Sequence, residues 1–300
     1  MESFLRETLQ YSLEGELQYQ AVPRIAANEL TLKAVSKDLS TLSSVSFRHI
    51  DYRNREARIA LCEQIVTELI VLPRLADDEQ IKLGDGGAVP ADGFLAGKQA
   101  YLIVGLPASG KSSIAAYIAD KKGAGILDSD FAKRKLPEFR CVSFGASLVH
   151  DESSEIVFGA PSKTRGYQSM LEVVAQAGMN LVIPKIGNDV EAVEDLAKTL
   201  KLYKYAVHLT LVDLPKAKAT KRAISRFMET DRYVPLAMIH DSFGDLPSKT
   251  FLEVQKRNKS TKLFASFGVL NNDVDKGVLP KCMESTKNNA AELYKKARTK

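Results

Sequence analysis

The sequence predicts an α/β protein in which an N-terminal helical region precedes a doubly wound, mostly parallel β-sheet covered by helices. Residues 56–72 place apolar side chains at every third or fourth position, which is typical of a helix with one buried face. Residues 83–97 contain five glycines and one proline, which is the composition of a connecting loop. From residue 101 onward, short apolar runs alternate with helical patterns. This alternation favours parallel strands with helices on both faces of the sheet.

The glycine-rich loop is the clearest domain boundary. We therefore expect residues 1–90 to form a helical N-terminal region, and residues 98–300 to form the sheet-containing domain with a C-terminal helix. Asn28 is expected to cap a helix, because its short side chain accepts hydrogen bonds from the first amides of a helix. Residues 41–46 are rich in hydroxyl groups and are expected to be a connection, and Pro73 ends the amphipathic helix before the loop.

The second domain alternates strand and helix patterns. Strands are expected at residues 101–104, 125–127, 180–183, 206–212 and 263–270. Helices are expected at residues 111–120, 167–177, 190–200, 216–227, 236–243, 249–256 and 283–297. Ligands of such sheets bind at the carboxyl ends of the strands, so polar side chains that follow strands are the first candidates for a functional site.

Composition narrows the setting of the protein. With 300 residues, of which 45% are hydrophobic, the chain can bury a substantial core. The cysteines Cys62, Cys141 and Cys282 are odd in number and widely spaced, which argues against a disulfide framework and a zinc site. No apolar run approaches the roughly 20 residues of a membrane helix, and no classical export signal is visible. We expect a cytoplasmic protein, or one exported into a host cell by a non-classical route, and no membrane partner.

The net charge of +5 is modest for this length. Its densest concentration lies near the C-terminus and comprises Lys287, Lys295, Lys296, Arg298 and Lys300. Such a run is interpreted as a solvated helix end. Aromatic side chains are not interleaved with the basic ones in the regular way that a nucleic-acid stacking surface requires, so we expect no nucleic-acid partner.

A phosphate-binding motif lies between the first strand and the first helix of the second domain. Residues 105–112 read GLPASGKS and match the pattern Gly-x-x-x-x-Gly-Lys-Ser/Thr of the P-loop. The glycines let successive amides approach phosphate oxygens, and the helix adds the positive end of its dipole. Lys111 is expected to bridge the β- and γ-phosphates of ATP, and the Ser112 hydroxyl to bind Mg²⁺. The expected nucleotide contacts are Gly105, Ala108, Ser109, Gly110, Lys111, Ser112 and Ser113.

A second group of candidates follows the second strand. No Asn-Lys-x-Asp motif of a GTPase is present, and Asp213 is a weak candidate for the acidic residue of a motor ATPase. The stretch ILDSDFAKRKLPEF instead places Asp128 and Asp130 at a strand end. There, a carboxylate can orient an acceptor hydroxyl and take its proton during phosphoryl transfer. Alternatively, the two aspartates only cap the following helix.

A third group is the basic stretch KRAISRFMETDRYVPLAMIH at residues 221–240. Arg226 and Arg232 lie six residues apart, on a helix and at or just beyond its end. Planar arginine donors above the γ-phosphate stabilise the charge of a transferring phosphoryl group, as on the lid of a small-molecule kinase. The alternative is a solvated helix face.

Together these residues resemble the zeta toxin family of P-loop kinases over roughly residues 98–270. The likeness rests on the phosphate-binding loop, on ILDSDFAKRKLPEF, on AQAGMNLVI at 175–183, and on Arg226-Phe-Met-Glu with Arg232-x-x-Pro and His-Asp at 240–241. The resemblance implies an ATP- and Mg²⁺-dependent kinase, acting as a toxin or effector, that phosphorylates a sugar hydroxyl of a nucleotide metabolite of the UDP-N-acetylglucosamine type.

The resemblance also implies roles for single residues. Asp130 would be the catalytic base, Lys111 and Ser112 would hold ATP and magnesium, and Arg226 and Arg232 would clamp the phosphate. The substrate-binding candidates are Asp128, Lys185 and Arg165.

The chain departs from the family at the end of the third strand. The family usually has Glu-Gly-Thr where this chain has Pro184-Lys185-Ile186, and Leu136 stands where a histidine commonly precedes the proline. A lysine in a phosphate-rich cleft favours an anionic acceptor. A dinucleotide such as NAD is therefore an alternative substrate, and an ATP-binding regulatory scaffold with degenerate catalysis is a further alternative.

The resemblance finally implies a protein partner. Free toxin kinases are commonly inhibited by a helical antitoxin, so an antitoxin or chaperone-like inhibitor protein is an expected partner. Residues 1–90 could themselves be an attached inhibitor, a delivery segment or a packing layer, and their sequence does not distinguish these roles.

Overall fold

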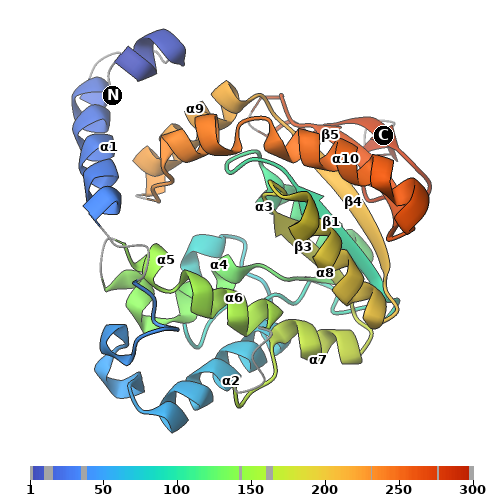
Figure 1. Cartoon of the computed structure of the whole chain (residues 1–300), viewed down its shortest axis with the longest axis horizontal. Coiled ribbons are helices and arrows are strands. Elements are labelled where there is room, and N and C mark those ends of the chain that lie inside the picture. Colours follow the sequence, from blue (N-terminus) through green and yellow to red (C-terminus); the bar gives the residue numbers. More distant parts are fainter. Residues whose placement is uncertain are drawn as a thin grey trace. The chain divides into compact units, whose positions relative to one another are not determined.

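The frame of the molecule is a twisted sheet with helices on its faces (Figure 1). The computed structural model describes residues 3–9, 16–34, 39–141, 144–159, 165–230, 232–275 and 277–296. The strands in this part of the chain are β1 (Gln99–Val104), β2 (Ala124–Ile126), β3 (Asn180–Lys185), β4 (Ala206–Asp213), β5 (Phe264–Asn271) and β6 (Lys281–Ser285). They form one sheet in the order β2-β3-β1-β4-β5-β6.

The strand directions confirm the mostly parallel α/β fold. Strand β2 pairs with β3, and β4 with β5, in parallel, whereas β6 runs antiparallel to β5 at the edge. The central strands are buried along nearly their whole length, as in β1, where every residue after Gln99 is buried. Continuous apolar runs of this kind are typical of strands that helices cover on both faces.

The α-helices connect and cover these strands. In chain order they are α1 (Glu16–Ala34), α2 (Arg55–Val71), α3 (Lys111–Lys122), α4 (Ser129–Lys135), α5 (Gly145–Leu148), α6 (His150–Phe158), α7 (Met170–Gln176), α8 (Val190–Leu202), α9 (Lys216–Thr230), α10 (Leu246–Thr261) and α11 (Glu292–Lys296). The predictions for α2, α3, α7, α8, α9 and α10 are confirmed to within a few residues at their ends. The segment predicted at 236–243 is a π-helical turn over Met238–Phe243.

Two predictions at the ends of the chain are wrong. Asn28 does not cap a helix, because α1 begins at Glu16 and continues through Pro23; the Asn28 side chain donates to the Arg24 carbonyl oxygen at 2.9 Å. The helix expected at 283–297 begins only at Glu292, and residue 297 lies outside the described part. Residues 281–285 form β6 instead, because the free edge of β5 supplies backbone hydrogen bonds that a local pattern does not reveal.

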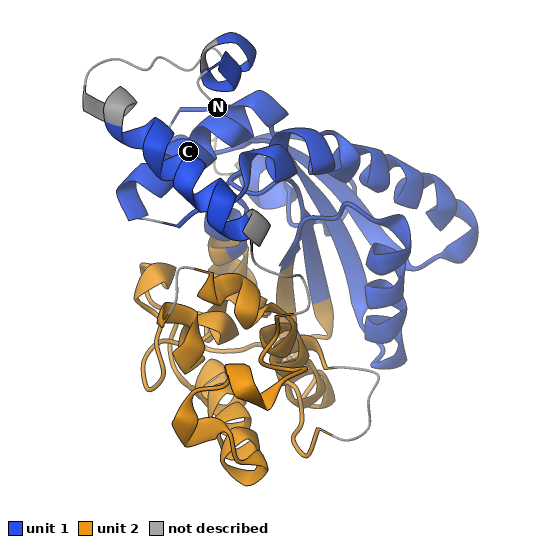
Figure 2. Cartoon of the chain, turned by 60° about the vertical axis from the view of Figure 1, so that its left-hand side comes forward, with its two compact units in different colours: residues 1–33, 100–115, 184–300 blue, residues 34–99, 116–183 orange. Residues whose placement is uncertain are grey.

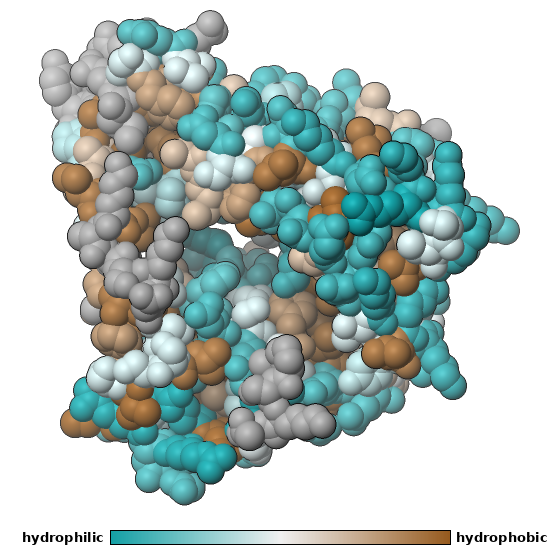
Figure 3. Space-filling view, viewed as in Figure 1, coloured by the Kyte–Doolittle hydropathy of each residue, from teal (hydrophilic) through white to brown (hydrophobic). Residues whose placement is uncertain are grey.

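Contacts divide the chain into two units (Figure 2). Unit 1 comprises residues 1–33, 100–115 and 184–300, and unit 2 comprises residues 34–99 and 116–183. The domain boundary predicted between residues 90 and 98 stays a prediction. In unit 1, the face drawn in Figure 3 is largely hydrophilic with scattered apolar side chains. Leu202 on α8 and Leu252 on α10 are among the exposed apolar residues. No helix within the described ranges is long and apolar enough to cross a membrane.

A buried ionic network joins the helices of unit 2. Arg58 on α2 donates from Nε to Glu152 Oε1 at 2.6 Å and from Nη1 to Glu138 Oε1 at 2.8 Å. All three residues are at most 3% exposed. Burial by itself raises the pKa of Glu138, but the hydrogen bonds and charge of Arg58 outweigh burial and lower this pKa. The network therefore ties α2 to the α4–α6 region through charges that have no access to water.

Replacing Arg58 by Met is expected to lower the free energy of unfolding by about 3–5 kcal/mol, because it leaves two carboxylates buried without a cation. Urea unfolding followed by circular dichroism measures this change. Arg257→Met is the matched control: Arg257 also contacts carboxylates, but its side chain is 39% exposed, and its loss should change stability little. Equal effects of the two variants would contradict a stabilising role for the buried network.

The same network predicts an acid-sensitive stability. Because the pKa of Glu138 is lower in the folded than in the unfolded chain, its contribution is fully present above the unfolded value near 4.5 and is lost as the pH falls through the folded pKa. The free energy of unfolding of the wild type should therefore fall as the pH is lowered below 4.5. In Glu138→Gln the fall over the same range should be smaller; an unchanged pH dependence would show that other groups cause it.

Candidate functional site

The predicted phosphate-binding loop, residues 105–112, joins β1 to the start of α3. Two of its residues have left-handed backbone angles, with φ of +59° at Ala108 and +89° at Gly110. Glycine adopts such angles without strain, and alternating angles of this kind can turn backbone amides toward a common point. The first amides of α3 have no acceptor within their own helix, and the first turn of α3 contains no acidic residue. The loop and the helix start therefore form a cradle of donors for an anion.

The Lys111 side chain folds back across this loop. Its Nζ donates to the Gly105 carbonyl oxygen at 2.7 Å and to the Leu106 carbonyl oxygen. The positive charge is thus held at the loop rather than in solvent. Ser112 and Ser113, by contrast, are exposed at the first turn of α3.

The back of the cradle is closed by β4 and by the loop after β5. A Cβ on Gly105 would lie 2.6 Å from the Val212 carbonyl oxygen, and one on Gly110 would overlap Asn272 Nδ2. The same Nδ2 donates to the Ser109 carbonyl oxygen at 2.6 Å. Both glycines are therefore required by close approach as well as by backbone angle. Asn272 positions the cradle, although no sequence signal near the motif points to it.

The Ser109 side chain lies beneath the cradle. The residue is fully buried, and its Oγ has no hydrogen-bond partner among the described residues. A Cβ on Gly105 would lie 3.1 Å from this Oγ. The hydroxyl is therefore a buried donor next to the first glycine of the motif.

A basic cavity of about 550 Å³ borders the loop that holds the cradle. It is lined by Lys218, Lys221, Arg222, Asp273, Val274, Asp275, Val278 and Lys281. Arg222 Nη2 donates to the carbonyl oxygens of Asn272 at 3.0 Å and of Val274 at 2.7 Å. Helix α9 thus fixes the loop that carries Asn272. The four cations against two carboxylates make the cavity suited to a negatively charged ligand.

Lys185 lies at the end of β3 and is half-buried. The next residue accepts a backbone hydrogen bond at 3.0 Å from Gly105, the first residue of the cradle. Gly187 packs so close to Val104 that a Cβ would lie 2.6 Å from Val104 Cβ. The end of β3, where residues 184–186 differ from the usual family pattern, therefore lies next to the cradle.

The two candidate clamp arginines belong to α9 and to the segment after it. Arg226 lies seven residues after Ala219 and three after Ala223, which places all three on one face of the helix. Ala219 and Ala223 pack in one apolar cluster with Leu106 of the cradle. Arg226 therefore shares the helix face that packs toward the cradle. Arg232 is half-buried just beyond the C-terminus of α9.

The remaining candidates belong to unit 2. Asp128 is the N-cap of α4, and its Oδ1 accepts from the amide of Asp130 at 2.9 Å. Asp130 forms an ion pair with Lys133 at 2.9 Å. Arg165 contacts Glu172 at 2.9 Å. The predicted donor side of the site is thus in unit 1, and the predicted acceptor side, apart from Lys185, is in unit 2.

The described residues contain no cluster of three or more His, Cys, Asp or Glu side chains that could hold a metal ion by themselves. A magnesium ion bound mainly by phosphate oxygens and water needs only one or two protein ligands. The exposed Ser112 hydroxyl at the start of α3 fits such a limited role.

Several solved structures are similar to this chain. One from the PezAT chromosomal toxin–antitoxin system of Streptococcus pneumoniae has a TM-score of 0.49 and 15% identity, with coverage of 68% of this chain and 81% of that chain. The complex of AvrRxo1-ORF1 with AvrRxo1-ORF2 has a TM-score of 0.48 and 18% identity, covering 83% and 72%. A gluconokinase from Sinorhizobium meliloti has a TM-score of 0.31 and 11% identity, covering 59% and 85%.

No curated protein sequence matches the chain. The family described as Zeta toxin matches residues 94–297, which is more than half of the chain and includes the cradle, both aspartates and both arginines. The chain therefore belongs to the zeta toxin family of P-loop kinases.

Proposed function

We propose that this protein is an ATP-dependent kinase that transfers the γ-phosphoryl group to a sugar hydroxyl of a nucleotide metabolite, and that it acts as a toxin or effector. Family membership supports the coarser statement, a kinase-type phosphotransferase that uses ATP. The observation that carries the proposal is the cradle, in which Lys111 is held at a loop of left-handed backbone that begins a helix.

The donor side follows from the cradle. The β- and γ-phosphates of ATP would bind the amides at 105–112, with Lys111 exchanging its two carbonyl contacts for phosphate oxygens. The rest of the nucleotide, with its charged α-phosphate, would extend toward the cavity beside Asn272, since the loop after β5 borders both. A magnesium ion bound by Ser112 and the phosphates would neutralise part of their charge.

The transfer step is a displacement at phosphorus. The acceptor hydroxyl oxygen bonds to the γ-phosphorus as the bond from that phosphorus to the β–γ bridging oxygen breaks, and ADP leaves. Asp130 would accept the hydroxyl proton, with Lys133 orienting its carboxylate. Arg226 and Arg232 would donate to the oxygens of the transferring group, where negative charge accumulates.

The acceptor is proposed to be anionic. Lys185 adds a positive charge at the strand end next to the cradle, where an uncharged sugar would gain nothing from it. Asp128 and Arg165 remain proposed substrate contacts. A UDP-N-acetylglucosamine-type nucleotide sugar is the first candidate, and NAD or another dinucleotide is the second. An ATP-binding scaffold without catalysis is the third, because the altered strand end removes the glutamate usual in the family.

A protein inhibitor is a further part of the proposal. A kinase toxin that depletes a common nucleotide endangers the cell that makes it, so we propose an antitoxin or chaperone-like partner. Action in the cytoplasm of the producing cell and export into a host cell are both compatible with this role.

Asp130→Asn is expected to keep ATP binding but to lower kcat for the accepted metabolite by about 10²–10⁴-fold, because the amide cannot take the acceptor proton. Phosphorylated UDP-N-acetylglucosamine and phosphorylated NAD, each heavier by one phosphoryl group, are measured by mass spectrometry. Calorimetric titration with ATP is the parallel binding measurement.

Two variants complete this experiment. Lys111→Ala should lose both ATP binding and transfer, whereas Lys133→Ala should retain most activity because it removes only the partner that orients Asp130. A fully active Asp130→Asn would refute the assigned base. A wild type that binds ATP but phosphorylates neither metabolite, nor any metabolite of a cell extract, would favour the scaffold.

A further inference from the structure

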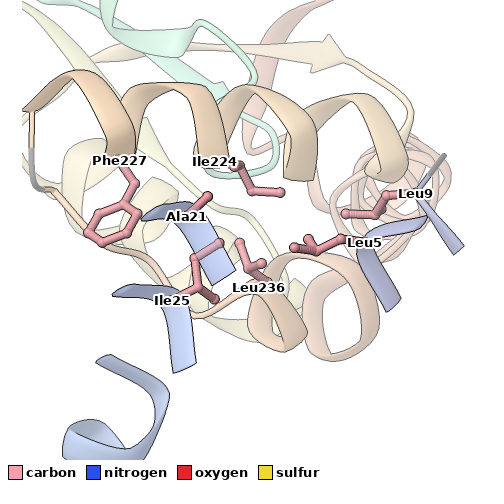
Figure 4. Close-up of a cluster of buried hydrophobic side chains, with 7 residues drawn as sticks. All are labelled: Leu5, Leu9, Ala21, Ile25, Ile224, Phe227 and Leu236. Atoms are coloured by element: carbon pink, nitrogen blue, oxygen red, sulfur yellow. The ribbon is translucent and has the colours of Figure 1, made fainter. Parts of the chain in front are cut away.

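The N-terminal segment of unit 1 packs against the helix that carries the candidate clamp. We call residues 3–9 and 16–33 the N-terminal brace. Figure 4 shows its apolar side chains pointing toward α9 and toward the segment after it. The buried cluster consists of Leu5, Leu9, Ala21 and Ile25 from the brace and of Ile224, Phe227 and Leu236 from α9 and the segment after it. Each of these residues is at most 2% exposed, so the contact excludes water.

Two polar contacts fix the orientation of the brace on α9. Glu29 Oε1 accepts hydrogen bonds from the Tyr233 hydroxyl and, at 3.3 Å, from the Leu236 amide. The Arg24 guanidinium lies 4.9 Å from the centre of the Phe227 ring, within the range of a cation–π interaction. Burial, with the nearby Glu29 carboxylate, raises the pKa of Tyr233, so the phenol stays protonated and donates.

Two of the residues that the brace contacts are sequence neighbours of the candidate clamp arginines. Phe227 follows Arg226, and Tyr233 follows Arg232. Residues 232–235 belong to neither a helix nor a strand, so their backbone place depends on contacts such as those with Glu29. The brace therefore acts on the backbone from which each arginine extends.

The adjoining face of α9 packs against the cradle. Ala219 and Ala223 share an apolar cluster with Leu106, and Ala108 lies at its margin. Small alanines on this face let the helix approach the loop closely. Helix α9 thus contacts the brace and the predicted phosphate-binding loop through two adjoining faces.

We propose that the brace is a positioning element of the kinase site, and that Glu29 is a positioning residue that fixes the backbone of Arg232. This inference rests on the proposed function. A long arginine side chain must be held in its productive geometry before transfer, because a displacement of about 1 Å can cost about 10²-fold in rate. In this role the N-terminal segment supports activity, which is the opposite of an attached inhibitor.

Two single substitutions, each of which shortens one side chain in the 300-residue chain, test the apolar contact. Ile25→Ala removes a fully buried side chain of the cluster, whereas Leu30→Ala removes a similar side chain that is 69% exposed on the same helix. Ile25→Ala should lower kcat by about 10–100-fold and leave the KM for ATP within about threefold, because the cradle stays intact. Leu30→Ala should change neither. A kcat that is unchanged in Ile25→Ala, or that rises, overturns the proposal, and a rise would make the brace an inhibitor.

The polar contact has its own variants. Glu29→Ala should lower kcat in the same way, and Glu29→Gln should restore part of it, because the amide oxygen can still accept from Tyr233 and Leu236. Combining Glu29→Ala with Tyr233→Phe should lower kcat by less than the product of the two single effects. Purely independent effects would contradict the assigned contact.

A proteolysis readout separates this inference from the proposed function. Trypsin cleaves after arginine, and Arg226 and Arg232 are half-buried in the braced state. Cleavage after both should be faster in Ile25→Ala and Glu29→Ala than in the wild type and Leu30→Ala. Equal cleavage in all four proteins refutes the brace even if the kinase is active. A wild type that phosphorylates nothing refutes the proposed function, and the cleavage rates still decide whether the brace positions the arginines.

Discussion

The close approach of the β4 backbone and the Asn272 side chain to the predicted phosphate-binding loop is the constraint on which the candidate site depends. Strand β4 leaves no room for a side chain at Gly105, and Asn272 leaves none at Gly110. Asn272 in turn depends on Arg222, which holds the loop after β5. The conformation of the loop at residues 105–112 therefore depends on β4, α9 and the loop after β5, whose contacting residues lie more than 100 residues away in the chain.

Helix α9 connects the parts of this assembly. Its first turns line the basic cavity, its alanine face packs on the cradle, and its apolar face accepts the N-terminal brace. In the proposed site, a rigid helix that contacts the loop and carries Arg226 would keep the distance between the bound phosphate and the guanidinium constant. This dependence explains why residues with no catalytic chemistry, such as Ile25, can matter to the proposed transfer.

The sequence predicted those features that depend on local pattern. The strand, the loop at residues 105–112 and the helix around Lys111 could be predicted from the sequence. The backbone angles that glycine permits and the spacing of apolar side chains depend on residues that are neighbours in the chain. Asn272 could not, since its role is a contact across the sheet. The second half of strand β6 was expected to be helical, because the edge of β5 with which it pairs is not a local property of the sequence. Asn28 has the residue type of a cap, but tertiary packing extends α1 past it. Asp128 does cap a helix, and the base role of Asp130 stays a prediction.

Calorimetric titration of ATP into Gly110→Ala and Gly93→Ala tests the phosphate-binding loop most directly. Both glycines have positive φ, so alanine strains both backbones, but only at Gly110 does a Cβ overlap another residue, whereas nothing lies within 4 Å at Gly93. We expect Gly110→Ala to lose ATP binding and Gly93→Ala to retain it, with both proteins folded by circular dichroism. Unchanged ATP binding by Gly110→Ala would contradict the assignment of this loop as the phosphate-binding site.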